Sequence, residues 1–135
     1  MERVSERIAL AQKALATFEE LATLAAPSVI ERDAAIQRFE YSFEAVWKAV
    51  QRYLKEMEGI EAASPKAVIR VALRSALLDE TEAREALQMV DDRNLTSHAY
   101  HEAVAKLIFS RAPGYAALMH AWVERLQERV TAERL

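Results

Sequence analysis

The scarcity of turn-forming residues is the feature that most constrains how this chain folds. The chain holds 2 glycines and 3 prolines among 135 residues, which are too few for the many tight turns of an all-β fold. Gly59 and Gly114 stand far apart, so the chain has no glycine-rich loop to cradle a phosphate. We therefore expect a mostly helical protein, long enough to bury a substantial core.

Apolar residues recur at helical spacing along the whole chain. In the first stretch they follow one another in steps of three and four, which predicts an amphipathic helix over about residues 2–24. The members of this stripe are Val4, Ile8, Ala11, Leu15, Phe18, Ala22 and Ala25. Further stripes predict three more helices, which lie between Ser28 and Gly59, from Pro65 to about Leu78, and from Asp79 to about Asn94.

Capping residues support these boundaries. Ser28 with Glu31, and Asp79 with Glu82, have the spacing of a capping box, in which each side chain satisfies a backbone N–H of the other residue. A fifth helix is expected from about Tyr100, and Pro113-Gly114 is expected to kink it or to restart it as a final helix.

Short connections between long helices favour antiparallel neighbours. The sequence therefore predicts one all-α domain over residues 1–135, an antiparallel up-and-down four-helix bundle with one or two additional short helices.

Charge and composition exclude several classes of protein. Lys and Arg total 18 against 21 Asp and Glu, so the chain lacks the overall basic excess of many nucleic-acid binders. It has no cysteine, which excludes disulfides, zinc–thiolate sites and thiol nucleophiles. No apolar run approaches the roughly 20 residues that span a bilayer, and the first residues lack an apolar signal core. We expect a cytoplasmic protein without membrane contact.

The densest cluster of polar residues lies between two predicted helices, over residues 91–102. Arg93 closes one helix and His98 opens the next, so a single turn brings them close. A guanidinium suits phosphate oxygens and an imidazole exchanges protons near neutral pH, a combination able to support metal-free RNA cleavage. The same spacing also fits a structural junction, in which Asp91 or Asp92 neutralises Arg93 and His98 caps a helix.

A row of charged residues at spacing of four borders the apolar stripe of the second predicted helix. It consists of Glu40, Glu44 and Lys48, in which Glu44 and Lys48 have the favourable order for an ion pair. Glu40 either lines a pocket or tethers Arg93, or the row is a solvated border.

A second row, Lys66, Arg70 and Arg74, is locally basic because no acidic residue occurs between Glu61 and Asp79. Such a stripe meets RNA phosphates, a nucleotide or an acidic partner, or it is an ordinary exposed face. His98, His101 and Glu102 share a helical turn, but the chain lacks the paired Glu-x-x-His motifs of di-iron bundles, so we expect no metal and no cofactor.

Two motifs together resemble one known superfamily. Arg93, four residues, His98, one residue and Tyr100 resemble the signature of HEPN proteins, and Asn94 after the arginine also fits. The run Arg-Phe-Glu-Tyr-Ser-Phe-Glu-Ala-Val-Trp-Lys over residues 38–48 resembles the hallmark of one HEPN branch, the nucleotidyltransferase substrate-binding proteins. These are small helical partners of minimal nucleotidyltransferases. The resemblance covers about residues 1–130.

The resemblance implies a four-helix bundle, usually a homodimer, which works with a separately encoded minimal nucleotidyltransferase in a toxin–antitoxin-like pair. In related pairs the HEPN member is a metal-independent ribonuclease whose arginine and histidine face each other across the dimer, and in some pairs the nucleotidyltransferase adds AMP to the motif tyrosine. Carried over, Arg93 binds phosphate, His98 is the acid–base, Asn94 orients one of them and Tyr100 is the modification site.

Three hypotheses follow for this chain. The first is an interaction module, the substrate-binding partner of the nucleotidyltransferase, with RNA or a nucleotide as a further ligand. The second is a HEPN endoribonuclease that AMP addition at Tyr100 neutralises. The third is a non-catalytic dimeric bundle whose polar cluster only holds the helix junction.

Overall fold

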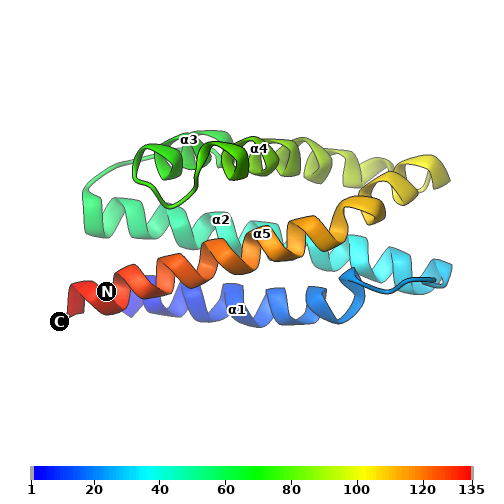
Figure 1. Cartoon of the computed structure of the whole chain (residues 1–135), viewed down its shortest axis with the longest axis horizontal. Helices are drawn as coiled ribbons and strands as arrows, with labels where there is room; N and C mark the ends of the chain where they lie inside the picture. Colours follow the sequence, from blue (N-terminus) through cyan, green and yellow to red (C-terminus); the bar gives the residue numbers. More distant parts are fainter. Residues whose placement is uncertain (1, 135) are drawn as a thin grey trace.

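The computed structural model describes residues 2–134, which form helices joined by short turns, with no strand in this range. The elements are α1 (Glu2–Ala22), α2 (Val29–Glu58), α3 (Pro65–Arg74), α4 (Glu80–Leu95), the 3₁₀ helix η1 (Thr96–His98) and α5 (Glu102–Arg134). In Figure 1, α1 and α4 run in one direction along the long axis, α2 and α5 run in the opposite direction, and α3 precedes α4 on the same side of the bundle. The predicted all-α bundle with short additional helices is confirmed.

Apolar side chains fill the space between the helices. The predicted stripe of α1 is buried from Val4 to Ala22, whereas Ala25 lies beyond the helix end and is exposed. At the centre, the ring of Phe39 from α2 stacks on Tyr115 from α5, with 5.3 Å between centroids, and also packs against Phe18 from α1 at 5.9 Å. These contacts join three helices around one aromatic cluster.

The predicted caps are present. Ser28 Oγ accepts a hydrogen bond from the Glu31 backbone N–H at 3.0 Å, and the Glu31 carboxylate accepts one from the Ser28 N–H at 2.8 Å. Asp79 and Glu82 make the same reciprocal pair at 2.8 and 2.9 Å. Gly59 ends α2 in the left-handed conformation with a φ of 66°, which glycine adopts without steric cost.

The predicted end of the third helix is wrong. The helix α3 ends at Arg74 rather than near Leu78, because Ala76 takes a left-handed φ of 59° and reverses the chain. The Leu77 backbone N–H then bonds back to the carbonyl of Ala72 at 2.9 Å. This turn buries both Leu77 and Leu78, so their apolar side chains belong to the core without belonging to the helix.

Of the two outcomes expected at Pro113, a kink or a new helix, the new helix is wrong. The helix α5 runs without interruption from Glu102 to Arg134, with Pro113 inside it (Figure 1). Proline removes one backbone donor, but Ala112, Tyr115 and Ala116 around it are buried in the core. We attribute the continuity of α5 to this packing, which outweighs the tendency of proline to interrupt a helix.

Within residues 2–134, none of the helices combines the length and the apolar character that a membrane span requires.

Candidate functional site

The predicted site lies where the chain passes from α4 to α5, at one end of the bundle (Figure 1). Arg93 is in the last turn of α4, His98 ends η1, and Tyr100 lies in the turn that precedes α5. The helix α5 begins at Glu102, two residues later than Tyr100, so the tyrosine stands in a turn rather than on a helix face.

Glu44 on α2 is the carboxylate that pairs with Arg93. It accepts a hydrogen bond from Arg93 Nη2, and it also lies 3.7 Å from the ammonium of Lys48. Arg93 Nη1 is 3.4 Å from the side-chain oxygen of Asn94, and Arg93 Nε is buried without a hydrogen-bond partner among the described residues. The guanidinium is thus half-buried and fixed against α2, and its buried Nε–H is unused.

The prediction that Asp91 or Asp92 neutralises Arg93 is therefore wrong. Asp92 points into the core, where its two oxygens lie 2.8 and 2.9 Å from Arg111 Nη1 on α5. Asp91 points outward and pairs with Lys66 at 3.1 Å. Because successive helical residues face different directions, the three neighbours at positions 91–93 meet three different helices.

Tyr115 completes the buried network around Asp92. Its hydroxyl donates to Asp92 Oδ2 at 2.5 Å, and the burial of the ring raises the pKa of Tyr115, with a further contribution from Asp92. The carboxylate in turn raises the pKa of the Arg111 guanidinium through their hydrogen bonds. This network ties the end of α4 to α5 and holds the backbone that carries Arg93.

Glu40 lies at the same turn but does not contact Arg93. Its carboxylate is 3.2 Å from the hydroxyl of Thr96, which is itself 2.7 Å from the carbonyl of Arg93. Glu40, Thr96 and Tyr100 help line a shallow groove of about 280 Å³. Of the two roles expected for Glu40, the structure shows the lining of a pocket, while Glu44 is the tether.

Three rings cluster at the surface of the turn. The centroids of Tyr100 and His101 are 4.4 Å apart, and those of Tyr100 and His98 are 6.1 Å apart. Tyr100 is 77% exposed, and within residues 2–134 neither its hydroxyl nor the His98 ring makes a hydrogen bond. The predicted capping of a helix by His98 is thus not found, and the phenol is open to another molecule.

The basic row on α3 divides into two parts. Lys66 is engaged by Asp91 of α4. Arg70 and Arg74 are exposed and form no ion pair with any acidic residue in the described range. In the same range, no group of three or more His, Asp or Glu side chains is arranged to hold a metal ion.

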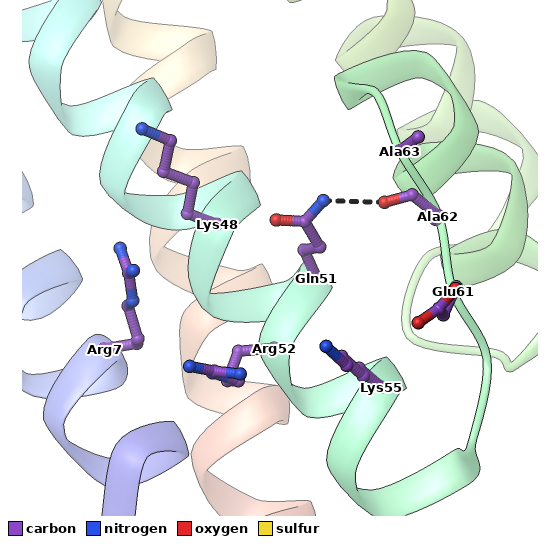
Figure 2. A pocket seen from close by; sticks show the side chains of 8 residues that line it. All are labelled: Arg7, Lys48, Gln51, Arg52, Lys55, Glu61, Ala62 and Ala63. Atoms are coloured by element: carbon purple, nitrogen blue, oxygen red, sulfur yellow. Dashed lines mark hydrogen bonds between the residues drawn. The ribbon is translucent and has the colours of Figure 1, made fainter.

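A groove lined by several cations was not predicted from the sequence. It has a volume of about 650 Å³, and its cationic lining consists of Arg7 from α1 with Lys48, Arg52 and Lys55 from α2 (Figure 2). Only Lys48 was among the sequence candidates. The spacing of Lys48, Arg52 and Lys55 on one face of α2 was a visible signal, but Arg7 joins them only through the tertiary fold.

Comparison with known proteins places this geometry in a family. A sequence model of the family described as "nucleotidyltransferase substrate binding protein like" matches residues 6–128. The chain belongs to this family. The match confirms the resemblance found in the sequence motifs.

Two individual relatives are similar to this chain. A crystal structure of ttk003001694 from Thermus thermophilus is 62% identical, with a TM-score of 0.85, and the match covers 86% of this chain and 98% of that one. A curated relative, the probable ribonuclease HepT of Haemophilus influenzae, is 28% identical over 76% of this chain and 74% of its own length.

Two more distant structures share the fold alone. HI0074 of Haemophilus influenzae, described as revealing the fold of a substrate-binding domain of a nucleotidyltransferase, is 21% identical with a TM-score of 0.72, over 89% of this chain and 98% of that chain. A chain of a mutant toxin–antitoxin pair, MntA–HpeT, is 11% identical with a TM-score of 0.78, over 95% and 99%.

Proposed function

We propose that this chain is the helical substrate-binding partner of a separately encoded minimal nucleotidyltransferase, in a toxin–antitoxin-like pair. The family match over residues 6–128 is the observation that carries the proposal. Two descriptions support it, because that of HI0074 names a nucleotidyltransferase and that of MntA–HpeT names a toxin–antitoxin pair. We further infer that the chain acts as a homodimer in the cytoplasm.

Tyr100 is the residue that we propose the partner modifies. Its ring is 77% exposed in a turn, so an enzyme can approach its hydroxyl without unfolding a helix. In adenylyl transfer, the phenolic oxygen bonds to the α-phosphorus of ATP, the bond to the leaving pyrophosphate breaks, and the phenolic proton passes to a base. The buried Asp92 network keeps the supporting α4–α5 junction in place during this encounter.

Co-expression tests this function. The chain is produced with the nucleotidyltransferase encoded beside its gene, the complex is isolated through a tag on the nucleotidyltransferase, and the intact mass of the chain is measured after incubation with ATP and Mg²⁺. We expect co-purification and a mass increase by adenylyl groups. Tyr100→Phe should abolish the increase, whereas Tyr41→Phe, at another exposed tyrosine, should retain it. Absence of a complex would refute the proposal.

A metal-independent ribonuclease is the second candidate function, favoured by the relative named as a probable ribonuclease and by the presence of Arg93 and His98 at one turn. In such a reaction His98 takes the 2′-hydroxyl proton, the 2′-oxygen attacks phosphorus, and the 5′-oxygen leaves with a proton. Arg93 stabilises the charge on the phosphate oxygens. Asn94, which lies within reach of the guanidinium, orients it.

RNA cleavage in the presence of a chelator decides this second function. We expect His98→Ala and Arg93→Ala to abolish cleavage, while His101→Ala, at the other histidine of the turn, retains it. Equal cleavage by all variants would exclude the site. If Arg93→Ala lowers only the melting temperature, and changes neither cleavage nor complex formation, the third hypothesis of a purely structural junction holds.

A further inference from the structure

The basic groove between α1 and α2 has no role in the proposed function. Four cations line it, Arg7, Lys48, Arg52 and Lys55, against one carboxylate, Glu61 (Figure 2). The chain as a whole has a net charge of −3, so this concentration of positive charge runs against the average. We propose that the groove binds the phosphate backbone of single-stranded RNA.

The cations are placed along the groove rather than at one point. Lys48, Arg52 and Lys55 follow one another along α2, and the first and last of them are about 10 Å apart along the helix axis at 1.5 Å per residue. A second groove of about 460 Å³ shares Arg7 and Arg52, and Arg3, Glu6 and Leu10 complete its lining, so three cations there face one carboxylate. The positive surface is thus elongated, as expected for a strand with successive phosphates.

Two of these cations have no competing carboxylate. Arg7 and Lys55 form no ion pair with an acidic residue in the described chain. Lys48 and Arg52 have loose pairs along their own helix, at 3.7 Å to Glu44 and 3.4 Å to Glu56. A phosphate therefore meets charges that are not already neutralised by close contacts.

The rest of the lining favours contacts to phosphates over contacts to apolar groups or bases. Apart from the charged residues it consists of Gln51, Ala62 and Ala63, without an aromatic ring or a large apolar side chain. A protein partner would be anchored by such side chains, and a free nucleotide would use them to stack its base. A groove with charge alone holds a backbone without reading its sequence.

A hydrogen bond holds one wall of the groove, the loop between α2 and α3, in place. Gln51 Nε2 donates a hydrogen bond to the carbonyl of Ala62 at 2.7 Å, which fixes the α2–α3 loop opposite the cations (Figure 2). The groove also leads toward Arg93, because Glu44 pairs with both Lys48 and Arg93. A strand held along α2 is thus directed toward the α4–α5 turn.

Binding of a labelled single-stranded oligonucleotide tests the proposal. Fluorescence anisotropy of the chain alone, with a 2′-O-methyl RNA that resists cleavage, is measured over a salt series. Single-strand binding varies with about the −0.7 power of salt concentration for each phosphate contact, so four cations predict a slope of about −2.8. The double variant Arg7→Gln/Lys55→Gln should lower the slope by about 1.4 and weaken binding about 25-fold at 0.1 M salt.

The matched control is Arg84→Gln/Lys13→Gln, which removes the same charge from one arginine and one lysine that are exposed outside the groove, and it should leave binding nearly unchanged. Melting curves verify that all variants fold. Equal loss in both double variants, or no loss in the groove variant, would overturn the proposal. So would displacement of the RNA by tripolyphosphate at equal phosphate concentration, which indicates a site for a free polyphosphate.

Binding to the nucleotidyltransferase is measured separately on the same variants. If the groove variant loses the nucleotidyltransferase but keeps the oligonucleotide, the groove is a protein-docking surface and the RNA proposal is wrong. If the wild-type chain binds no nucleotidyltransferase but binds RNA through the groove, the proposed function fails and this inference stands.

Discussion

Replacing Asp92 by alanine removes the centre of the network that joins α4 to α5. Asp92 is 2% exposed, and its carboxylate accepts hydrogen bonds from Arg111 and Tyr115. Breaking a buried ion pair from one side costs about 3–5 kcal/mol, because the other charge is left uncompensated. Arg111 is one-third exposed at 33% and regains water, so we expect about 2–4 kcal/mol.

Thermal unfolding followed by circular dichroism measures this loss. At about 2.1 cal/mol/K per residue, the 135-residue chain unfolds with an entropy of about 0.28 kcal/mol/K, so 3 kcal/mol lowers the melting temperature by about 10 °C. The neighbouring variant Asp91→Ala is the control, because its ion pair with Lys66 is exposed and contributes about 1 kcal/mol or less. Equal decreases in melting temperature for Asp91→Ala and Asp92→Ala would show that the buried network of Asp92 does not stabilise the fold more than an exposed ion pair.

The other predictions concern helix geometry and pH. Gly114→Ala should raise the melting temperature by about 2–3 °C, because Gly114 is helical and a new Cβ meets only a Glu85 oxygen at 3.7 Å, whereas Gly59→Ala should lower it, because Gly59 has a φ of +66°. A hydrogen bond from Arg125 lowers the pKa of Glu82, so Glu82 stabilises the fold above its unfolded pKa and loses this effect as pH falls through the folded pKa. Urea unfolding between pH 7 and pH 3 should therefore show a smaller acid-induced loss for Glu82→Gln than for the wild type, and an equal loss would contradict this linkage.

Local features of the fold were predictable because short-range chemistry decides them. The capping box of Ser28 and Glu31 joins residues three apart, so its hydrogen bonds are implied by the sequence and are present in the structure. The apolar stripe of α1 identified core residues for the same reason. At Pro113 the prediction of a new helix was wrong, because the packing of buried neighbours along α5 outweighs the break that proline favours locally.

The place of the candidate residues in the fold was predictable, but their contacts were not. Arg93 and His98 do lie at one helix junction, as their spacing indicated. The partner of Arg93 is Glu44, which is 49 positions away, and the partner of Asp92 is Arg111 on the next helix. Such pairs depend on how helices are rotated against one another, and hydrophobic periodicity alone does not fix that rotation to the accuracy of a hydrogen bond.

Binding of this chain to a minimal nucleotidyltransferase underlies the proposed function. Isothermal titration of the purified chain with the nucleotidyltransferase encoded beside its gene measures this binding. We expect saturable binding with a Kd of about 1 μM or tighter, which corresponds to about −8 kcal/mol. Absence of binding at about 100 μM of both folded proteins, by heat and by co-sedimentation, would show that the chain is not a partner of this enzyme.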